Sequence, residues 1–150
     1  MIDFIQDLQN AITLRFGDRL QIEALDFNKR GCHLDITASG GDIQEVALLV
    51  DGLGYTLEAI SGVDWPAAGA MEVVYDFNKM AAGGRIAVRV RIPREKPELP
   101  SIGNIFGGAN WHEREAHDMF GIVFCGHPNL APLLLPEDAT FHPLRKDFAS

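Results

Sequence analysis

Apolar residues recur every three or four positions in three stretches of the chain, and this spacing predicts amphipathic helices. The first two stretches cover residues 3–16 and 43–53. A third helix is predicted over residues 110–120, where Asn110 is placed to cap the first turn and Glu113 to complete that cap. A glycine follows each stretch, as is common where helices end. Each helix has one apolar face, which we expect to be buried against another element.

Alternation of apolar and polar residues predicts strands between the helices. In residues 85–92 the isoleucines and valines share one face, and Arg85, Arg89 and Arg91 point the other way with Ala87 between them. Gly83 and Gly84 supply the turn from the strand before it. The predicted strands lie at residues 20–27, 32–37, 55–60, 71–77 and 85–92. This order predicts an α+β fold, with a mixed or antiparallel sheet packed against two to three helices.

Residues 122–150 differ in character from everything before them. Prolines recur at positions 128, 132, 136 and 143, and they argue against a long helix or a sheet strand. Leucine and phenylalanine nevertheless keep the segment too apolar for a free linker, so it must lie on a surface of this domain or of a partner. We therefore predict a folded domain over residues 1–121 and an extended, proline-rich docking tail over residues 122–150.

Composition and charge are those of one soluble globular domain. The chain has 150 residues, of which 47% are hydrophobic and 23% charged, and its net charge is −8. This charge argues against a general affinity for nucleic acid or anionic lipid. Two cysteines cannot form a disulfide framework or hold a four-thiolate cluster. No apolar run has the length of a membrane span, and no secretory signal is evident, so we expect a cytoplasmic location.

Basic residues outnumber acidic ones in residues 81–110, unlike the stretches before and after. The basic row formed by Arg85, Arg89 and Arg91 is either a docking surface for an acidic partner or an ordinary solvated strand face. A nucleic-acid module built on this row is a further alternative, which the overall negative charge disfavours.

The helix predicted over residues 110–120 also carries potential metal ligands, namely His112, Glu113 and His117. A zincin places two histidines four residues apart, on one face of a helix. Here they are five apart, or about 140° around the helix, so capping and side-chain pairing explain these residues better than ligation. No dinucleotide, phosphate-loop or serine-hydrolase signature is evident. A binding or assembly domain is the leading interpretation, and a small metal-dependent enzyme using these three residues is the alternative.

The same helix begins a series of motifs that resembles one known family. Residues 110–122 read Asn-Trp-His-Glu-Arg-Glu-Ala-His-Asp-Met-Phe-Gly-Ile, and Gly-His-Pro-x-Leu follows at 126–130. Residues 134–138 read Leu-Leu-Pro-Glu-Asp, and residues 142–148 read His-Pro-Leu-Arg-Lys-Asp-Phe. In this order the motifs resemble the 30-kDa subunit of respiratory complex I, the NADH:quinone oxidoreductase. The resemblance covers about residues 45–148.

The resemblance implies a subunit with no catalytic centre and no cofactor of its own. Members of this family sit in the soluble arm of a membrane-associated redox complex, on the cytoplasmic face. They dock on a large subunit similar to that of nickel–iron hydrogenases, and an iron–sulfur small subunit belongs to the same complex. Iron–sulfur clusters, with nickel–iron or flavin in some complexes, are held by these partners, and the electrons reach quinone or protons.

The resemblance also implies which residues contact the partners. Arg114 and Asp118 would pair with each other or contact the large subunit, and the tail would wrap around that neighbour. The alternatives are a capping role for Glu113 and a core position for Trp111 and Phe120. The residues expected at the partner interface are Glu113, Arg114, Glu115, Asp118, Phe120, His127, Pro128, Leu130, Leu134, His142, Pro143, Arg145, Lys146, Asp147 and Phe148.

Two features depart from the complex I pattern. Ala131 and Pro132 stand where complex I members usually carry two basic residues. The sequence also ends soon after Phe148, where many of those members continue. Both features are more similar to the small subunits of membrane-bound energy-converting nickel–iron hydrogenases. The sequence therefore favours that branch slightly, with NADH:quinone oxidoreductase close behind.

Overall fold

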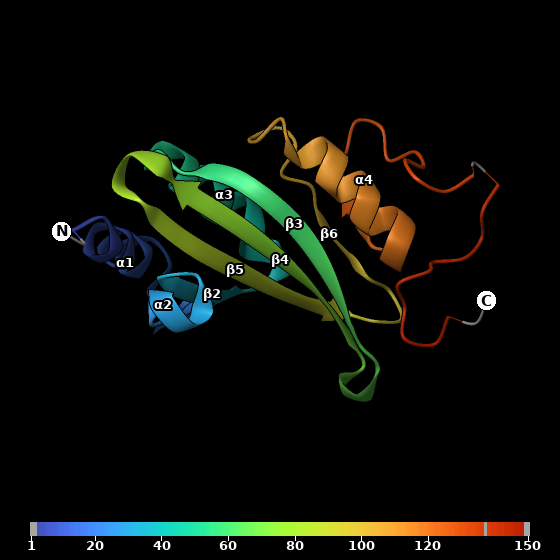
Figure 1. The fold of residues 1–150 in the computed structure, drawn as a ribbon, viewed down its shortest axis with the longest axis horizontal. Helices are drawn as coiled ribbons and strands as arrows, with labels where there is room; N and C mark the ends of the chain where they lie inside the picture. Colours follow the sequence, from blue (N-terminus) through green and yellow to red (C-terminus); the bar gives the residue numbers. More distant parts are fainter. Residues whose placement is uncertain (1–2, 137, 149–150) are drawn as a thin grey trace.

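The computed structural model describes residues 3–136 and 138–148, which form an α+β domain around one main sheet (Figure 1). The strand order across this sheet is β1-β2-β5-β4-β3. Strands β2 and β5 run parallel, whereas the other neighbouring pairs are antiparallel, so the sheet is mixed as predicted. The strands are β1 (Gln21–Ala24), β2 (Leu34–Ala38), β3 (Thr56–Trp65), β4 (Ala70–Lys79) and β5 (Gly84–Pro93).

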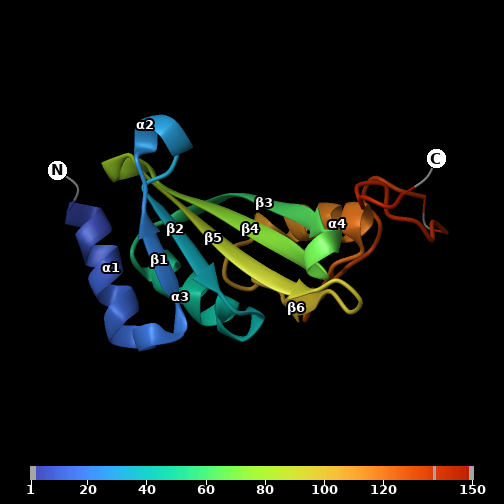
Figure 2. The same ribbon diagram turned by 90° about the horizontal axis from the view of Figure 1, so that it is seen from below.

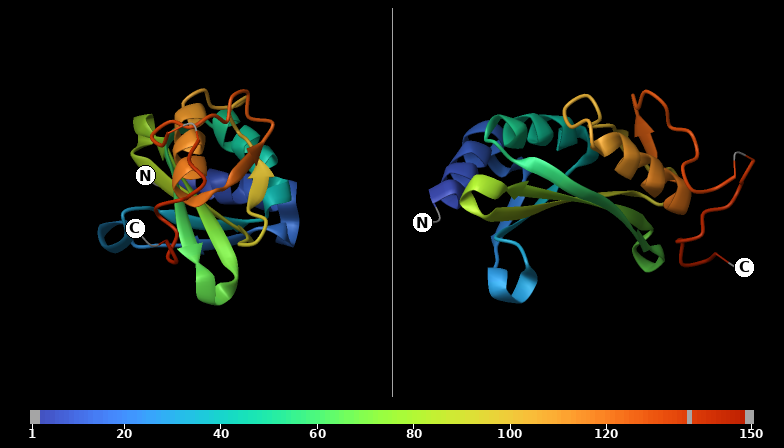
Figure 3. Two further views of the ribbon diagram at one scale, coloured as in Figure 1. Left: turned by 90° about the vertical axis from the view of Figure 1, so that its right-hand side faces the viewer. Right: turned by 45° about the horizontal axis from the view of Figure 1, so that its top comes forward.

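Three helices lie on one side of the sheet and leave its other face open (Figure 3). The helices of the described residues are α1 (Asp3–Phe16), α2 (Phe27–Arg30), α3 (Ile43–Gly52) and α4 (Ala109–Phe120). Helices α1, α3 and α4 form the covering layer, and α2 is a single turn between β1 and β2. Seen from below, the short strands β1 and β2 lie near α1, while β3, β4 and β5 extend towards α4 (Figure 2).

The buried face of the sheet follows the predicted alternation. Met71, Val73, Tyr75 and Phe77 of β4 are all fully buried beneath the helices. Their neighbours in β4 point to the open face, because successive strand residues face opposite ways. Strand β3 is longer than the predicted residues 55–60, since it pairs with β4 as far as Trp65.

The basic row of β5 lies on the open face and is paired there with acidic side chains of the other strands. Arg89 contacts Asp35 at 2.9 Å and Glu72 at 3.3 Å, and Arg91 contacts Glu72 at 3.2 Å. Arg85 likewise contacts a glutamate of β3. The row is therefore part of a mixed-charge strand face and not a single-sign patch for an acidic partner or a nucleic acid.

A second, two-stranded sheet contradicts the prediction that residues 122–150 contain no strand. Strands β6 (Glu98–Pro100) and β7 (Val123–Cys125) pair in parallel. The side chains of Ile122 and Phe124 are almost completely buried in the main core. The proline pattern could not reveal this strand because β7 precedes the first proline of the segment. The folded core therefore includes residues 122–125, and the extended part of the chain starts after them.

Candidate functional site

Helix α4 carries the first of the family motifs of residues 110–148, which we call the signature, and it packs directly over β3. The close packing of α4 on β3 depends on Gly62, because a Cβ at this position would come within 2.5 Å of the Phe120 ring. Phe120 is 8% exposed and belongs to the core, as one alternative predicted, whereas Trp111 is 61% exposed on the outer side. Glu115 is also exposed on that side. The helix thus joins a buried inner face to an outer face that meets the rest of the tail.

The predicted N-terminal cap of α4 is wrong. The helix begins at Ala109 with Gly108 before it, so Asn110 lies inside the first turn. The side-chain oxygen of Asn110 is buried, with no hydrogen-bond partner among the described residues. Glu113 turns inward and accepts hydrogen bonds from the Ser101 hydroxyl at 2.5 Å and the Ile102 amide at 2.9 Å. Glu113 therefore ties α4 to the segment that follows β6.

The surroundings of Glu113 favour the protonated form of its carboxyl group. Its carboxyl group is fully buried, and this burial raises its pKa above the ordinary value, although the hydrogen bonds from Ser101 and Ile102 oppose the shift. His127 lies beside it, with Nε2 at 3.9 Å from the carboxylate. The Asn129 amide donates to Nδ1 of His127, so in the neutral ring Nε2 carries the proton and donates to the Asn110 carbonyl oxygen.

Arg114 and Asp118 do not pair with each other, although they lie one turn apart. Arg114 donates from Nε and Nη2 to the carbonyl oxygens of Ala131 and Pro132, at 2.9 and 2.8 Å. Asp118 accepts hydrogen bonds from three consecutive backbone amides, those of residues 133, 134 and 135, at 2.7, 2.6 and 3.3 Å. Together the two charged side chains hold one tail segment, residues 131–135, against the outer side of α4: Arg114 binds its first two residues and Asp118 its last three.

The surroundings of Asp118 lower the pKa of its carboxyl group, whereas those of Glu113 raise it. Burial alone would raise the pKa of Asp118, but the backbone amides of residues 133–135 stabilise the carboxylate and hold its pKa below the ordinary value. Asp118 is thus a charged clamp on the tail at neutral pH.

Later tail residues complete the C-terminal end of α4. The last four carbonyl groups of a helix have no partner within the helix. Here Gly121, with φ of 78°, donates its amide to the His117 carbonyl at 2.8 Å. The other three carbonyls, of Asp118, Met119 and Phe120, accept from His142 Nδ1, the Leu144 amide and Arg145 Nε, at 3.0, 3.0 and 2.7 Å. Residues 142–145 therefore cap the helix from a distance of more than twenty positions along the chain.

A third attachment joins the end of the tail to the sheet, through two residues that the sequence did not single out, Asp64 and Arg94. Asp64 of β3 accepts a bidentate pair from Arg94, at 2.7 and 2.9 Å. The same carboxylate accepts from the Lys146 amide at 2.8 Å, and Arg94 also contacts Asp147 at 3.1 Å. The Arg94 hydrogen bonds hold the pKa of Asp64 below its ordinary value. Asp64 lies outside the signature, and no local pattern links it to a residue 82 positions away.

These attachments leave a set of apolar tail side chains facing outward, which we call the tail face. Its members are Leu134, Phe141, Leu144 and Phe148, which are 63%, 44%, 53% and 40% exposed. The rings of Phe141 and Phe148 lie 5.9 Å apart. Exposed apolar side chains that lie together, as Phe141 and Phe148 do, are typical of an interaction surface.

The remaining interface candidates are distributed around this segment. Leu130 packs partly buried against the core, Pro143 is also partly buried, and Pro128 is exposed. The structure thus brings the candidates of α4 and the tail together, with Glu113 and Phe120 inside and Glu115 and Leu134 outside.

The geometry does not support the metal-dependent alternative. Within the described part of the chain, no three His, Cys, Asp or Glu side chains form a group that could hold a metal ion. Glu113 points into the core, and Nδ1 of His117 lies 2.8 Å from the Ile122 carbonyl oxygen. Across residues 3–136 and 138–148, no helix is both long and apolar enough to cross a bilayer.

Comparison with known sequences identifies one family. Residues 36–150 match the family described as "Respiratory-chain NADH dehydrogenase, 30 Kd subunit". An NADH-quinone oxidoreductase subunit of Salinispora arenicola is 44% identical and aligns with 97% of this chain and 60% of its own length. The protein of the same name from Chlorobium phaeobacteroides is 46% identical, over 61% of this chain and 56% of its own length. The chain thus spans little more than half the length of these relatives.

Comparison with solved structures identifies the same fold. A chain from the "membrane-bound sulfane sulfur reductase (MBS), an archaeal respiratory membrane complex" superposes with a TM-score of 0.83 at 23% identity. The match covers 98% of this chain and 86% of that one. The trypsin-resistant fragment of Nqo5 superposes with a TM-score of 0.68 at 29% identity, over 83% of this chain and 97% of the fragment.

Proposed function

Because the chain belongs to the family of the 30-kDa subunit of respiratory-chain NADH dehydrogenase, we propose that it is a docking and assembly subunit of a complex I-type redox complex. In this proposal the chain contributes no catalytic centre and binds no cofactor. It occupies the soluble arm of the complex, on the cytoplasmic side of the membrane. Its neighbours are a hydrogenase-like large subunit and an iron–sulfur small subunit, which hold the redox centres.

The observation that carries the proposal is the tail face. Arg114, Asp118 and the end of α4 hold the tail in one conformation by hydrogen bonds, while the apolar side chains of that segment stay exposed. A surface that is ordered before binding loses less conformational entropy when a partner covers it. In the assembled complex, the large subunit lies over this face. The expected polar contacts around it are those of His142, Arg145, Lys146 and Asp147.

Two parent complexes remain candidates, and different observations favour them. The names of the relatives in Salinispora and Chlorobium favour a complex that reduces quinone. Ala131 and Pro132 favour the branch of energy-converting hydrogenases. This second signal is weakened by the finding that both residues contact Arg114 through backbone carbonyls, which residues of other types also supply. Paired Cys-x-x-Cys nickel ligands in the co-purifying large subunit would identify a hydrogenase, and their absence a quinone oxidoreductase.

Co-purification from the source cells tests the docking proposal. The tagged chain should co-purify with the large subunit, and replacing Leu134, Leu144 and Phe148 by serine should reduce the recovered large subunit at least tenfold. The matched control replaces Leu14, Leu48 and Met80, which are 91%, 54% and 77% exposed and lie outside the tail, by serine. We expect this control to retain the partner. Equal recovery with both triple variants would contradict the proposal.

A further inference from the structure

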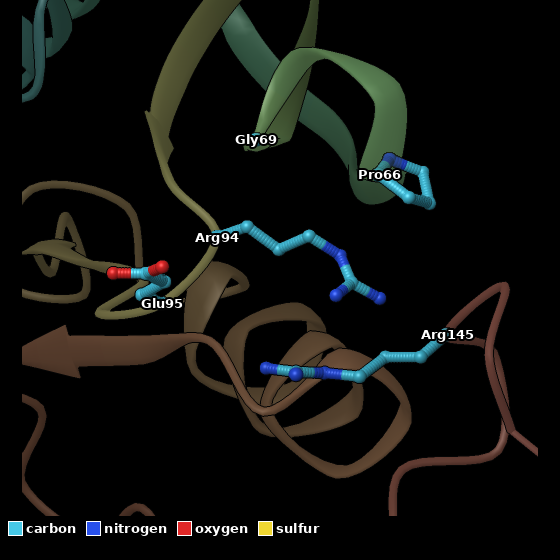
Figure 4. Close-up of a pocket in the computed structure, with 5 residues that line it drawn as sticks. All are labelled: Pro66, Gly69, Arg94, Glu95 and Arg145. Carbon is cyan, nitrogen blue, oxygen red and sulfur yellow. The ribbon is translucent and has the colours of Figure 1, made fainter.

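A polar hollow lies next to the tail face, between the β3–β4 turn and the end of the tail (Figure 4). Pro66 and Gly69 of the turn line one wall, and Arg145 of the tail lines the opposite wall. Arg94 extends between them with its guanidinium group in the hollow, whereas the carboxylate of Glu95 points away (Figure 4). Two guanidinium groups from segments about fifty positions apart therefore share one open space.

Arg145 is held in place by a hydrogen bond and has no directly paired carboxylate among the described residues, although the buried carboxylate of Asp64 attracts it from farther away. Its Nε donates to the Phe120 carbonyl oxygen at 2.7 Å, which fixes the direction of the side chain. Among the described residues, no carboxylate lies within 4 Å of its guanidinium nitrogens, and no acceptor bonds the two terminal nitrogens. The terminal nitrogens are thus the part of Arg145 that is available to a ligand.

Arg94 is only partly occupied. Its Nε and Nη2 bind Asp64, a buried side chain behind it, and Nη2 also meets Asp147, which is 66% exposed at the rim. Within the part of the chain that the structure describes, its Nη1 has no hydrogen-bond acceptor. Arg94 is therefore fixed by one buried carboxylate and retains donors that point to the hollow.

We propose that this hollow receives an acidic side chain, aspartate or glutamate, of the large partner subunit. The proposal rests on the proposed function, since it assumes that the tail face is the docking surface. A planar guanidinium group binds a carboxylate through two parallel hydrogen bonds, and such pairs are stronger than neutral ones. Arginine is enriched at protein interfaces, and a fixed arginine is already oriented for the contact. The position of the hollow, on the tail segment that also carries Leu144 and Phe148, favours a carboxylate of the docked partner over a free anion.

A matched pair of substitutions at Pro66 tests the proposal without altering the tail. Pro66 is exposed, so Pro66→Glu introduces a carboxylate from this chain at the wall of the hollow, and Pro66→Gln introduces a neutral side chain of the same size. We expect Pro66→Glu to weaken binding to the purified large subunit at least tenfold and Pro66→Gln to change it less than twofold. Equal binding of both variants would overturn the proposal while leaving the proposed function intact. Failure of the unaltered chain to bind would instead reject the proposed function, and this proposal with it.

A second measurement separates a partner carboxylate from a small free anion. Inorganic phosphate, compared with chloride at equal ionic strength, should not raise the midpoint of thermal unfolding of the full chain. A rise in the unaltered chain that Arg145→Gln removes would identify the hollow as a free-anion site and overturn the proposal. Arg145→Gln should also weaken binding to the large subunit at least tenfold, while the backbone amides of residues 133–135 keep their protection from hydrogen exchange.

Discussion

Glu113 and Asp118 are two acidic residues of one helix whose surroundings give them different tasks. Glu113 is surrounded by core and accepts two hydrogen bonds, and its pKa is raised because burial outweighs them. Asp118 is also buried, yet three backbone amides converge on it and its pKa is lowered. The first residue joins α4 to the core, and the second holds the tail against the helix.

Replacing Asp118 by asparagine should weaken the attachment of the tail. Hydrogen bonds to a charged group contribute about 1.5–3 kcal/mol each, but an asparagine oxygen retains part of this interaction, so we expect a loss of about 1–3 kcal/mol. The measurement is the free energy of unfolding from urea titrations at pH 7. Glu115→Gln, on the exposed side of the same helix, should change it by less than about 0.5 kcal/mol.

The pH dependence of the same pair of proteins provides a second check on this assignment. The folded pKa of Asp118 is lowered, so its contribution is present above the unfolded pKa of about 3.9 and is lost as pH falls through the lower, folded value. The difference in stability between the unaltered chain and Asp118→Asn should therefore shrink in acid. If the stability difference between the two proteins stayed constant down to the acid transition, Asp118 would not hold the tail as a charged carboxylate.

Replacing Glu113 by glutamine should produce the opposite pH trend. The folded pKa of Glu113 is raised, so the unaltered chain loses stability as pH rises from the unfolded pKa of about 4.3 through the folded value. Relative to Glu113→Gln, which does not titrate at this position, the unaltered chain should therefore become less stable as pH rises above the unfolded pKa. Urea unfolding at several pH values measures this, and a flat difference would refute the assignment.

At the scale of elements, the sequence predicts the helices, strands and turns that depend on the local spacing of residues. The helices at α1 and α3, the strands of the β3–β4–β5 meander and the glycine turn before β5 all follow from periodicity and turn chemistry. The cap on α4 was predicted wrongly, because the Asn110 and Glu113 side chains lie inside the first turn and the core, and pattern alone does not report burial. The pairing of β6 with β7 and the Asp64–Arg94 contact were missed for a related reason, since both join distant segments.

In the candidate site, too, the sequence predicts local features better than contacts between distant segments. The signature indicates α4 and the tail, but Arg114 and Asp118 bind backbone groups of residues 131–135. Because every residue type has these backbone groups, the sequence does not reveal such contacts. A motif can therefore indicate which side chains matter without indicating which atoms they bind. The predicted interface contacts of these residues with another subunit stay a prediction.

The packing of α4 on β3 is an element-scale feature with a direct test at Gly62. Gly62→Ala places a methyl group against the Phe120 ring, so the helix must move or the ring must change its rotamer. Overpacking of this kind costs about 1–3 kcal/mol, and we expect a loss of stability in that range by urea unfolding. Ser61→Ala, at the exposed neighbouring position, should be nearly neutral, and equal stability of both variants would show that the contact is not tight.

On the scale of the whole molecule, the open face of the sheet and the tail face differ in charge and in exposed apolar side chains. The open face of the sheet carries arginines paired with acidic residues of other strands, so positive and negative charges are mixed on this face. The other end of the molecule carries the tail face and the polar hollow beside it. We therefore expect the partner subunit to dock at the tail end and to leave the open sheet face uncovered.

Site-specific photo-crosslinking in the assembled complex distinguishes these two surfaces. A photoreactive side chain would replace Leu134 or Phe141 on the tail face, and Thr37 on the open sheet face, one position at a time. The two tail positions should cross-link to the large subunit, and Thr37 should not. Cross-links from Thr37 to the large subunit, with none from Leu134 or Phe141, would show that docking does not use the tail face.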